Sequence, residues 1–159
     1  SGEEPYSMAM TLLETCRGYD VDMRILGSDI STRMLTIAQT GVYSAKRMEP
    51  VPAGWRATYF DKAGRGDEAE WAVTEKLRKL VVLKRINLTT TPFPMRGPLD
   101  IVFCRNVMIY FDDAGRRKLL DEIFRLLKPG GFLLVGHAES LTGMVSKFRS
   151  IEPSVYVRP

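Results

Sequence analysis

The chain has 159 residues, of which 45% are apolar and 26% are charged, and it carries a net charge of +4. This balance is that of an ordinary globular protein, so it excludes disordered and collagen-like chains, and the length favours one compact domain with room for a small inserted lobe. No apolar run reaches the roughly 18 residues needed to cross a bilayer, and the basic residues do not interleave with aromatic ones, so we expect neither membrane insertion nor a nucleic-acid partner.

The first 44 residues predict a helix, a strand and a second helix. Residues 5–16 repeat apolar side chains at helical spacing. Residues 23–29 form a short apolar run that ends in the carboxylate of Asp29, which is typical of a buried strand. Ser31 then caps a helix, and Gly41 stands where a left-handed C-terminal residue is wanted.

The middle of the chain, from residue 45 to about residue 85, has a different pattern because proline and glycine interrupt it. Residues 58–60 and 71–73 flank the polar turn 64–67, which predicts a β-hairpin lobe. Residues 81–83 are expected to be the last strand of this lobe and to lead back into the main sheet.

The second half alternates strands and a helix. Residues 99–104 predict a strand, Asp112 opens a helix, and residues 129–131 (PGG) stop it. Residues 132–135 predict another apolar strand, and residues 155–157 alternate like the closing strand of a hairpin. This alternation favours a mostly parallel α/β sheet.

Polar residues follow several of these strands, and ligands of open α/β sheets bind beyond the carboxyl ends of the strands. An Asp or Asn at such an end, taken alone, is more often a turn or a helix cap than a ligand. Several of them at one edge favour a site. They are Asp29, Asn87, Arg105, Asn106 and residues 137–140.

Two features indicate a nucleotide-like ligand and argue against other chemistry. Residues 2–5 lie just before a helix, where backbone donors would meet the ligand, and Asp29 follows at the distance at which a carboxylate grips a ribose. His137 is the only histidine, and neither Ser140 nor Cys104 has triad spacing. The two cysteines form no disulfide framework and no metal set, so we expect a reducing compartment and no metal.

Six segments resemble one known family when they are taken in chain order. They are residues 1–7 (SGEEPYS), 28–30 (SDI), 87–88 (NL), 103–111 (FCRNVMIYF), 126–131 (LLKPGG) and 136–140 (GHAES). The chain resembles the catalytic domain of the chemotaxis receptor methyltransferases of the CheR type, and the match covers nearly all of it. Residues 104–111 (CRNVMIYF) and residues 2–7 (GEEPYS) are specific, whereas LLKPGG indicates only a class I methyltransferase.

The resemblance implies an α/β fold. Its sheet would be the Rossmann-like sheet of the class I methyltransferases, which depend on S-adenosylmethionine (SAM), and a small antiparallel β-subdomain would be inserted in it. Residues 1–44 and 86–159 would form the methyltransferase domain, and residues 45–85 the inserted subdomain. The implied activity is the transfer of a methyl group from SAM to glutamate side chains on cytoplasmic helices of chemotaxis receptors, which leaves S-adenosylhomocysteine (SAH). The protein would be cytoplasmic.

The resemblance also implies site residues. Tyr110 would stand near the transferred methyl group. The cofactor contacts would be Glu3 in the SAM loop, Asp29 on the ribose or adenosine, Asn87 and Leu88 beside the adenine, and Asn106 and Val107 at the methionine and methyl end. Since a glutamate with a reference pKa of about 4.3 is already ionised near neutral pH, no general base is required, and Tyr110 is expected to position rather than to take a proton.

The family has a helical N-terminal domain and a first strand that precede the SAM loop, so we expect a truncated catalytic domain with an exposed sheet edge. Two other functions stay open. One is a catalytically incomplete receptor-docking or regulatory module, because the β-subdomain in some members binds a receptor C-terminal peptide by strand addition. The other is a class I methyltransferase with a different substrate, since fold alone does not set function.

Overall fold

The computed structural model describes residues 1–139, 141 and 147–159. The chain forms two compact units, residues 1–86 (the first unit) and residues 87–159 (the second unit), and each is described by itself. Within the described residues, no helix is both long and apolar enough to cross a bilayer.

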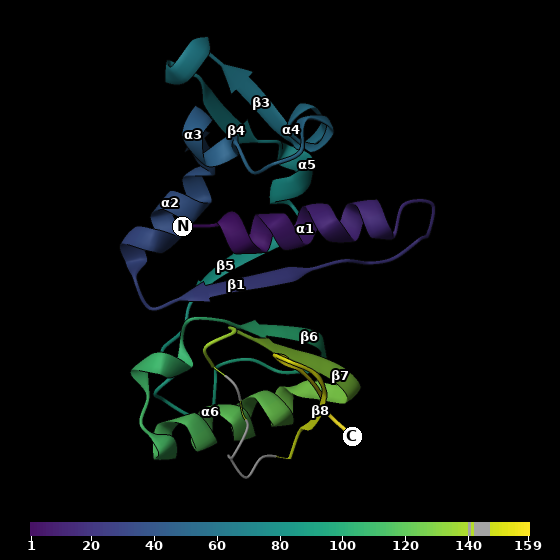
Figure 1. Ribbon diagram of the computed structural model, residues 1–159, viewed down its shortest axis with the longest axis vertical. Helices are drawn as coiled ribbons and strands as arrows, with labels where there is room; N and C mark the ends of the chain where they lie inside the picture. The colour runs from purple at the N-terminus through teal and green to yellow at the C-terminus, as the bar shows by residue number, and fades with distance from the viewer. Residues whose placement is uncertain (140, 142–146) are drawn as a thin grey trace. The chain divides into compact units, whose positions relative to one another are not determined.

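The first unit contains a parallel strand pair covered by a helix (Figure 1). Its elements are α1 (Glu3–Thr15), β1 (Ile25–Asp29), α2 (Thr32–Thr40) and β5 (Val81–Arg85). In the pairing, Ile25 lies opposite Val81 and Asp29 opposite Arg85. Gly27 allows the close approach of α1, because a Cβ there would lie 2.9 Å from Leu83 and 3.3 Å from the ring of Pro5. The first turn of α1 therefore lies against β1 two residues before Asp29.

The predicted caps of α2 are confirmed. The hydroxyl of Ser31 accepts a hydrogen bond from the N–H of Met34 at 3.3 Å. At the other end Gly41 has φ 58°, and its N–H donates to the carbonyl of Ile37 at 3.0 Å. The left-handed backbone conformation has the lowest steric cost at glycine, which is why the helix ends there.

A three-stranded antiparallel sheet forms the lobe, in the order β2-β4-β3. The elements of the lobe are β2 (Val42–Ser44), α3 (Ala45–Met48), α4 (Ala53–Tyr59), β3 (Phe60–Ala63), the 3-10 turn Gly66–Glu68, β4 (Glu70–Val73) and α5 (Glu75–Arg78). The predicted hairpin is confirmed as β3 and β4, which are joined through that turn.

Two expectations for the lobe were wrong. Thr58 and Tyr59 end α4 instead of opening a strand, because Tyr59 is buried and its hydroxyl donates to Glu14 of α1 at 2.6 Å. The strand after the lobe, β5, pairs with β1 and not with the lobe. The division into residues 1–44 with 86–159 and an inserted segment 45–85 stays a prediction.

A shared core joins the lobe to α1. Buried side chains of α1, among them Tyr6, lie in one cluster with Tyr43, Phe60 and Leu77 of the lobe. The guanidinium of Arg78 adds a polar tie, since it donates to the carbonyls of Gln39 and Thr40 at the end of α2 and of Val73 in β4. Cations at a helix C-terminus are favourable because the carbonyls there lack partners within the helix.

The second unit is a four-stranded sheet with one long helix (Figure 1). Its strand order is β6-β7-β9-β8, with β6 and β7 parallel and the other two pairings antiparallel. The elements are β6 (Leu99–Cys104), the 3-10 turn Met108–Tyr110, α6 (Asp113–Leu126), β7 (Leu127–Val135), β8 (Arg149–Glu152) and β9 (Val155–Val157). The four-stranded sheet has one parallel and two antiparallel pairings, so it is mixed and not mostly parallel, whereas the β1-β5 pair of the first unit is parallel.

The ends of α6 show one confirmed and one wrong prediction. Asp112 caps the helix, with its carboxylate accepting from the N–H of Gly115 at 2.8 Å. Residues 129–131 do not stop the helix, which ends at Leu126; they belong to β7. The reason is pairing with Arg158, whose carbonyl accepts from Gly130 at 2.8 Å and whose N–H donates to Gly131 at 2.9 Å. These bonds draw the glycines into the sheet.

Candidate functional site

Asp29 stands at the carboxyl end of β1, as the sequence predicts, and it already has a structural task. Its Oδ1 accepts a hydrogen bond from the N–H of Ser31 at 2.8 Å, which shapes the turn into α2. The Asp29 carbonyl accepts from the N–H of Ile86 at 3.2 Å. The half-buried carboxylate uses one oxygen for this turn, and its Oδ2 is the atom we consider for a ligand.

Glu3 is the first residue of α1, so residues 3–5 lie inside the helix and not in a loop before it. Gly2 caps the helix with φ 95°, and a Cβ there would lie 2.6 Å from the hydroxyl of Tyr43. The carboxylate of Glu3 accepts from Arg47 at 2.7 Å. Burial raises the pKa of Glu3, but hydrogen bonds from Ser1 and its own N–H, with the charge of Arg47, bring the pKa below its usual value.

Asn87 and Leu88 begin the second unit. The side-chain oxygen of Asn87 accepts from the N–H of Thr89 at 3.0 Å and from its hydroxyl at 2.8 Å. Asn87 therefore forms a local turn, which is the commonest task of an Asn after a strand. Its side-chain NH₂ group and the half-buried Leu88 stay candidates for an adenine contact.

Asn106 and Val107 lie in the loop that follows β6. Asn106 has a φ of 57°, a left-handed conformation that is uncommon outside glycine but tolerated by Asn. Its N–H donates to the carboxylate of Glu139 at 2.6 Å, and the N–H of Val107 donates to the same carboxylate at 2.7 Å. The side chain of Asn106 is exposed.

Glu139 is the functional candidate that the sequence reasoning missed, beyond placing residues 137–140 at a strand end. It is 6% exposed and is the one buried charged residue of the described chain. Besides Asn106 and Val107, the N–H groups of Met108 and Gly136 donate to it at 2.7 and 3.0 Å. Burial alone would raise the pKa of Glu139. The hydrogen bonds from the four N–H groups together lower the pKa by more than burial raises it, so it lies below its usual value. No local sequence signal marks this contact, because it joins residues about 30 positions apart.

Tyr110 lies at the end of the short 3-10 turn and is 82% exposed. Its N–H donates to the carbonyl of Val107 at 3.1 Å, so its backbone belongs to the same loop. Arg116 of α6 supports this loop by donating to the carbonyl of Met108 at 3.0 Å. His137 is exposed in the turn after β7.

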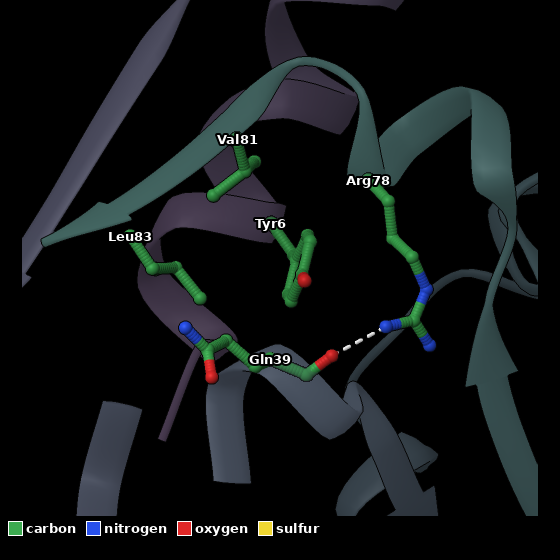
Figure 2. Close-up of a pocket in the computed structure, with 5 residues that line it drawn as sticks. All are labelled: Tyr6, Gln39, Arg78, Val81 and Leu83. Carbon is green, nitrogen blue, oxygen red and sulfur yellow. Dashed lines mark hydrogen bonds between the residues drawn. The ribbon is translucent and has the colours of Figure 1, made fainter. Parts of the chain in front are cut away.

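A separate pocket of about 230 Å³ lies in the first unit (Figure 2). It is lined by Tyr6, Gln39, Arg78, Val81 and Leu83, none of which is a predicted site residue. The Arg78 guanidinium that faces it is already hydrogen-bonded to three carbonyls. The pocket therefore offers little to hold a ligand. In the part of the chain that the structure describes, no three His, Cys, Asp or Glu side chains gather as a metal site would require.

The structure brings some of the predicted residues together within each unit, while Asn87 and Leu88 lie in a turn of their own. In the first unit, the first turn of α1, which begins with Glu3, lies against the strand that ends in Asp29. In the second unit, Asn106, Val107 and Tyr110 share one loop. Carboxylates accept hydrogen bonds from the hydroxyl and amino groups of a nucleoside with an amino-acid tail, and a side-chain amide can donate as well as accept. Each unit, taken by itself, therefore offers polar groups of kinds that SAM can hydrogen-bond to.

The family model that matches describes the "CheR methyltransferase, SAM binding domain", and it matches residues 1–157. The chain is 39% identical over 156 residues to chemotaxis protein methyltransferase 2 of Pseudomonas aeruginosa, covering 98% of this chain and 56% of that protein. It is 36% identical to a chemotaxis protein methyltransferase of Borreliella burgdorferi and 34% identical to that of Escherichia coli; each match covers 98% of this chain and 54% of the relative. The chain thus spans about half the length of the curated relatives it matches.

Glu139 makes the free energy of unfolding depend on pH. Its pKa in the folded state lies below the reference value of 4.5, so its stabilisation is fully present above about pH 4.5 and is lost as the pH falls through the lower, folded-state pKa. We expect Glu139→Gln to cost on the order of 2 kcal/mol near neutral pH, and this difference to shrink below about pH 4.5. Urea unfolding at a series of pH values measures it.

The matched control for this measurement is Glu152→Gln, which removes an exposed carboxylate from β8. We expect no comparable loss for it at any pH. A difference between wild type and Glu139→Gln that stays constant with pH would contradict the prediction.

Proposed function

The chain belongs to the CheR methyltransferase family as its SAM-binding domain, and from this premise we propose that it methylates glutamate side chains on cytoplasmic helices of chemotaxis receptors. The observation that carries the proposal is the family match over residues 1–157, supported by relatives that are chemotaxis protein methyltransferases. The products would be a glutamate methyl ester and SAH.

We assign the cofactor contacts by residue. In the first unit, Asp29 would accept hydrogen bonds from ribose hydroxyls, and Glu3 belongs to the segment that holds the cofactor. In the second unit, Asn87 and Leu88 would contact the adenine. Asn106 and Val107 would line the methionine and methyl end. When bound, SAM supplies a methyl group on a positively charged sulfur.

The residues of this chain have only to orient the reactants. The substrate carboxylate is anionic at neutral pH, so no side chain has to remove a proton. A carboxylate oxygen forms the new bond to the methyl carbon, the carbon–sulfur bond breaks, and its electron pair stays on sulfur. Holding these atoms in line is worth on the order of 7 to 11 kcal/mol. Tyr110, exposed at the end of a fixed loop, is our candidate for positioning the substrate.

The antiparallel lobe is our candidate for receptor docking. β3 is an edge strand, since the sheet order is β2-β4-β3, and an extended peptide can add to such an edge. Beside it, the half-buried Trp71 lies opposite Lys62, whose ammonium is 5.2 Å from the ring, and Arg56 lies 5.8 Å from the ring. Two cations on an indole next to a free edge favour a peptide with acidic side chains. The same observation supports a docking module as the second candidate function.

Cofactor binding is tested by calorimetric titration of the 159-residue chain with SAH. We expect one-site binding, weakened about tenfold or more in Asp29→Ala because the ribose loses its acceptor. Asp29→Asn keeps an oxygen that can accept from the N–H of Ser31. It therefore separates the effect of losing the turn on SAH binding from the effect of losing the negative charge. Asp61→Ala, an exposed carboxylate on β3, is expected to bind as the wild type does. Absence of binding by the wild type would refute SAM binding by this chain.

Methyl transfer is tested with full-length protein, SAM labelled in its methyl group, and a receptor cytoplasmic fragment. We expect base-labile methyl esters, because glutamate esters hydrolyse in base whereas N-methyl groups do not. Tyr110→Phe should lower kcat about tenfold if its hydroxyl positions the substrate. The control is Tyr19→Phe, another exposed tyrosine at 75% exposure. Unchanged turnover in Tyr110→Phe removes the hydroxyl from the mechanism, and base-stable product rules out glutamate as the acceptor.

Docking is tested with a peptide from a receptor C-terminus, whose binding is followed by fluorescence anisotropy. We expect Trp71→Ala to weaken binding about tenfold or more, since a Trp at the centre of an interface commonly carries that much. Lys84→Ala on β5 removes an exposed cation outside the lobe and serves as the control. Binding that is indifferent to Trp71 would show that the peptide does not use this face.

A further inference from the structure

Charged side chains hold the loop after β6 from both sides. The carboxylate of Glu139 accepts from three consecutive N–H groups, those of Asn106, Val107 and Met108. On the carbonyl side, the guanidinium of Arg116 donates to Met108. Three converging N–H groups form the kind of concavity that binds anions, and here an anion of the chain itself fills it.

This arrangement determines which atoms a ligand can meet. The three N–H groups are already used, so a bound molecule would meet the exposed side chain of Asn106 instead. The left-handed conformation of Asn106 is unfavourable for a residue other than glycine and persists only when its surroundings enforce it. Directly after the held segment, Ile109 and Tyr110 are 49% and 82% exposed. A loop that is fixed and yet exposes large side chains is organised for a partner outside itself.

The fourth bond ties the loop to the neighbouring strand. Gly136, which follows β7, donates its N–H to Glu139 at 3.0 Å, and the preceding residue, Val135, pairs with Cys104 at the end of β6. A Cβ on Gly136 would lie 2.5 Å from Oε2 of Glu139. Glycine at this position lets the carboxylate reach both strand ends.

We propose that Glu139 is a positioning residue, which presets the loop after β6 for the methionine end of SAM before the ligand arrives. The inference rests on the proposed function, because Asn106 and Val107 are assigned to that end of the cofactor. If the loop is ordered before the ligand binds, the entropic cost of ordering the loop is not subtracted from the binding free energy. Residues that hold a binding residue in place raise affinity in this way. Glu139 does not touch the ligand and acts through the backbone of Asn106 and Val107.

The test compares two ligands that differ in the amino-acid tail. SAH carries it, whereas 5′-methylthioadenosine keeps the adenosine and the sulfur but lacks the tail. Calorimetry with wild type, Glu139→Gln and the control Glu152→Gln measures both affinities. We expect Glu139→Gln to weaken SAH binding about tenfold or more and to leave methylthioadenosine within about twofold, because only the tail meets this loop. Amide hydrogen exchange at residues 106–108 should become faster in the same variant.

A second variant guards against a folding defect. Gly136→Ala keeps Glu139 but displaces its carboxylate, so it should also weaken SAH binding more than methylthioadenosine binding. Equal weakening of both ligands in both variants would mean that Glu139 only maintains the fold, and unchanged SAH affinity would mean that the loop needs no such support. Either result overturns the inference while leaving SAM binding in place. A wild type that binds neither ligand refutes the proposed function, and the inference falls with it.

Discussion

The buried carboxylate of Glu139 is the interaction on which the second unit's candidate site depends. A lone buried carboxylate would cost several kcal/mol, and only strong hydrogen bonds offset that cost. Four N–H groups at 2.6 to 3.0 Å supply them, and they come from the segments that follow two parallel strands, β6 and β7. The same bonds fix the backbone of Asn106 and Val107. The four hydrogen bonds that stabilise the ionised carboxylate therefore also set the geometry of the candidate site.

The polar residues at the other strand ends follow a related rule. Asp29 gives one oxygen to the N–H of Ser31, and the side-chain oxygen of Asn87 binds Thr89. A turn needs only part of the hydrogen-bonding capacity of an Asp or Asn side chain. Forming a turn and binding a ligand are thus compatible, since the turn fixes the side chain that the ligand would meet. A role of Asp29 and Asn87 in forming turns therefore does not exclude a role in binding a ligand.

Features that depend on neighbouring residues were predicted correctly, whereas features that depend on contacts between distant parts of the chain were not. Ser31, Gly41 and Asp112 act as caps because capping depends on residues within four positions, and the strand 99–104 has the predicted bounds. Tyr59 was misplaced because its burial depends on α1, more than 40 residues away.

The candidate site shows the same limit. The strand-end positions of Asp29 and Asn106 could be read from the chain, since each comes within three residues of the end of an apolar run. Glu139 could not be identified, because its partners at residues 106–108 are about 30 residues away and supply backbone N–H groups, which no side-chain pattern records. Its partner Gly136 is close in sequence, but a single glycine after a strand does not by itself indicate a carboxylate contact. For this site the sequence placed Glu139 among the strand-end residues 137–140 but did not identify its contact with residues 106–108.

Charge links these local features to the proposed reaction. The proposed substrate group is a carboxylate and the peptide proposed for the lobe is acidic, so a net charge of +4 favours the approach of both within about a Debye length. An exposed carboxylate in the loop after β6 would repel the substrate. For Glu139, the four N–H dipoles that point at its carboxylate offset part of the negative charge. The loop can thus be built around an anion and still receive another one, which a reaction at a glutamate side chain requires.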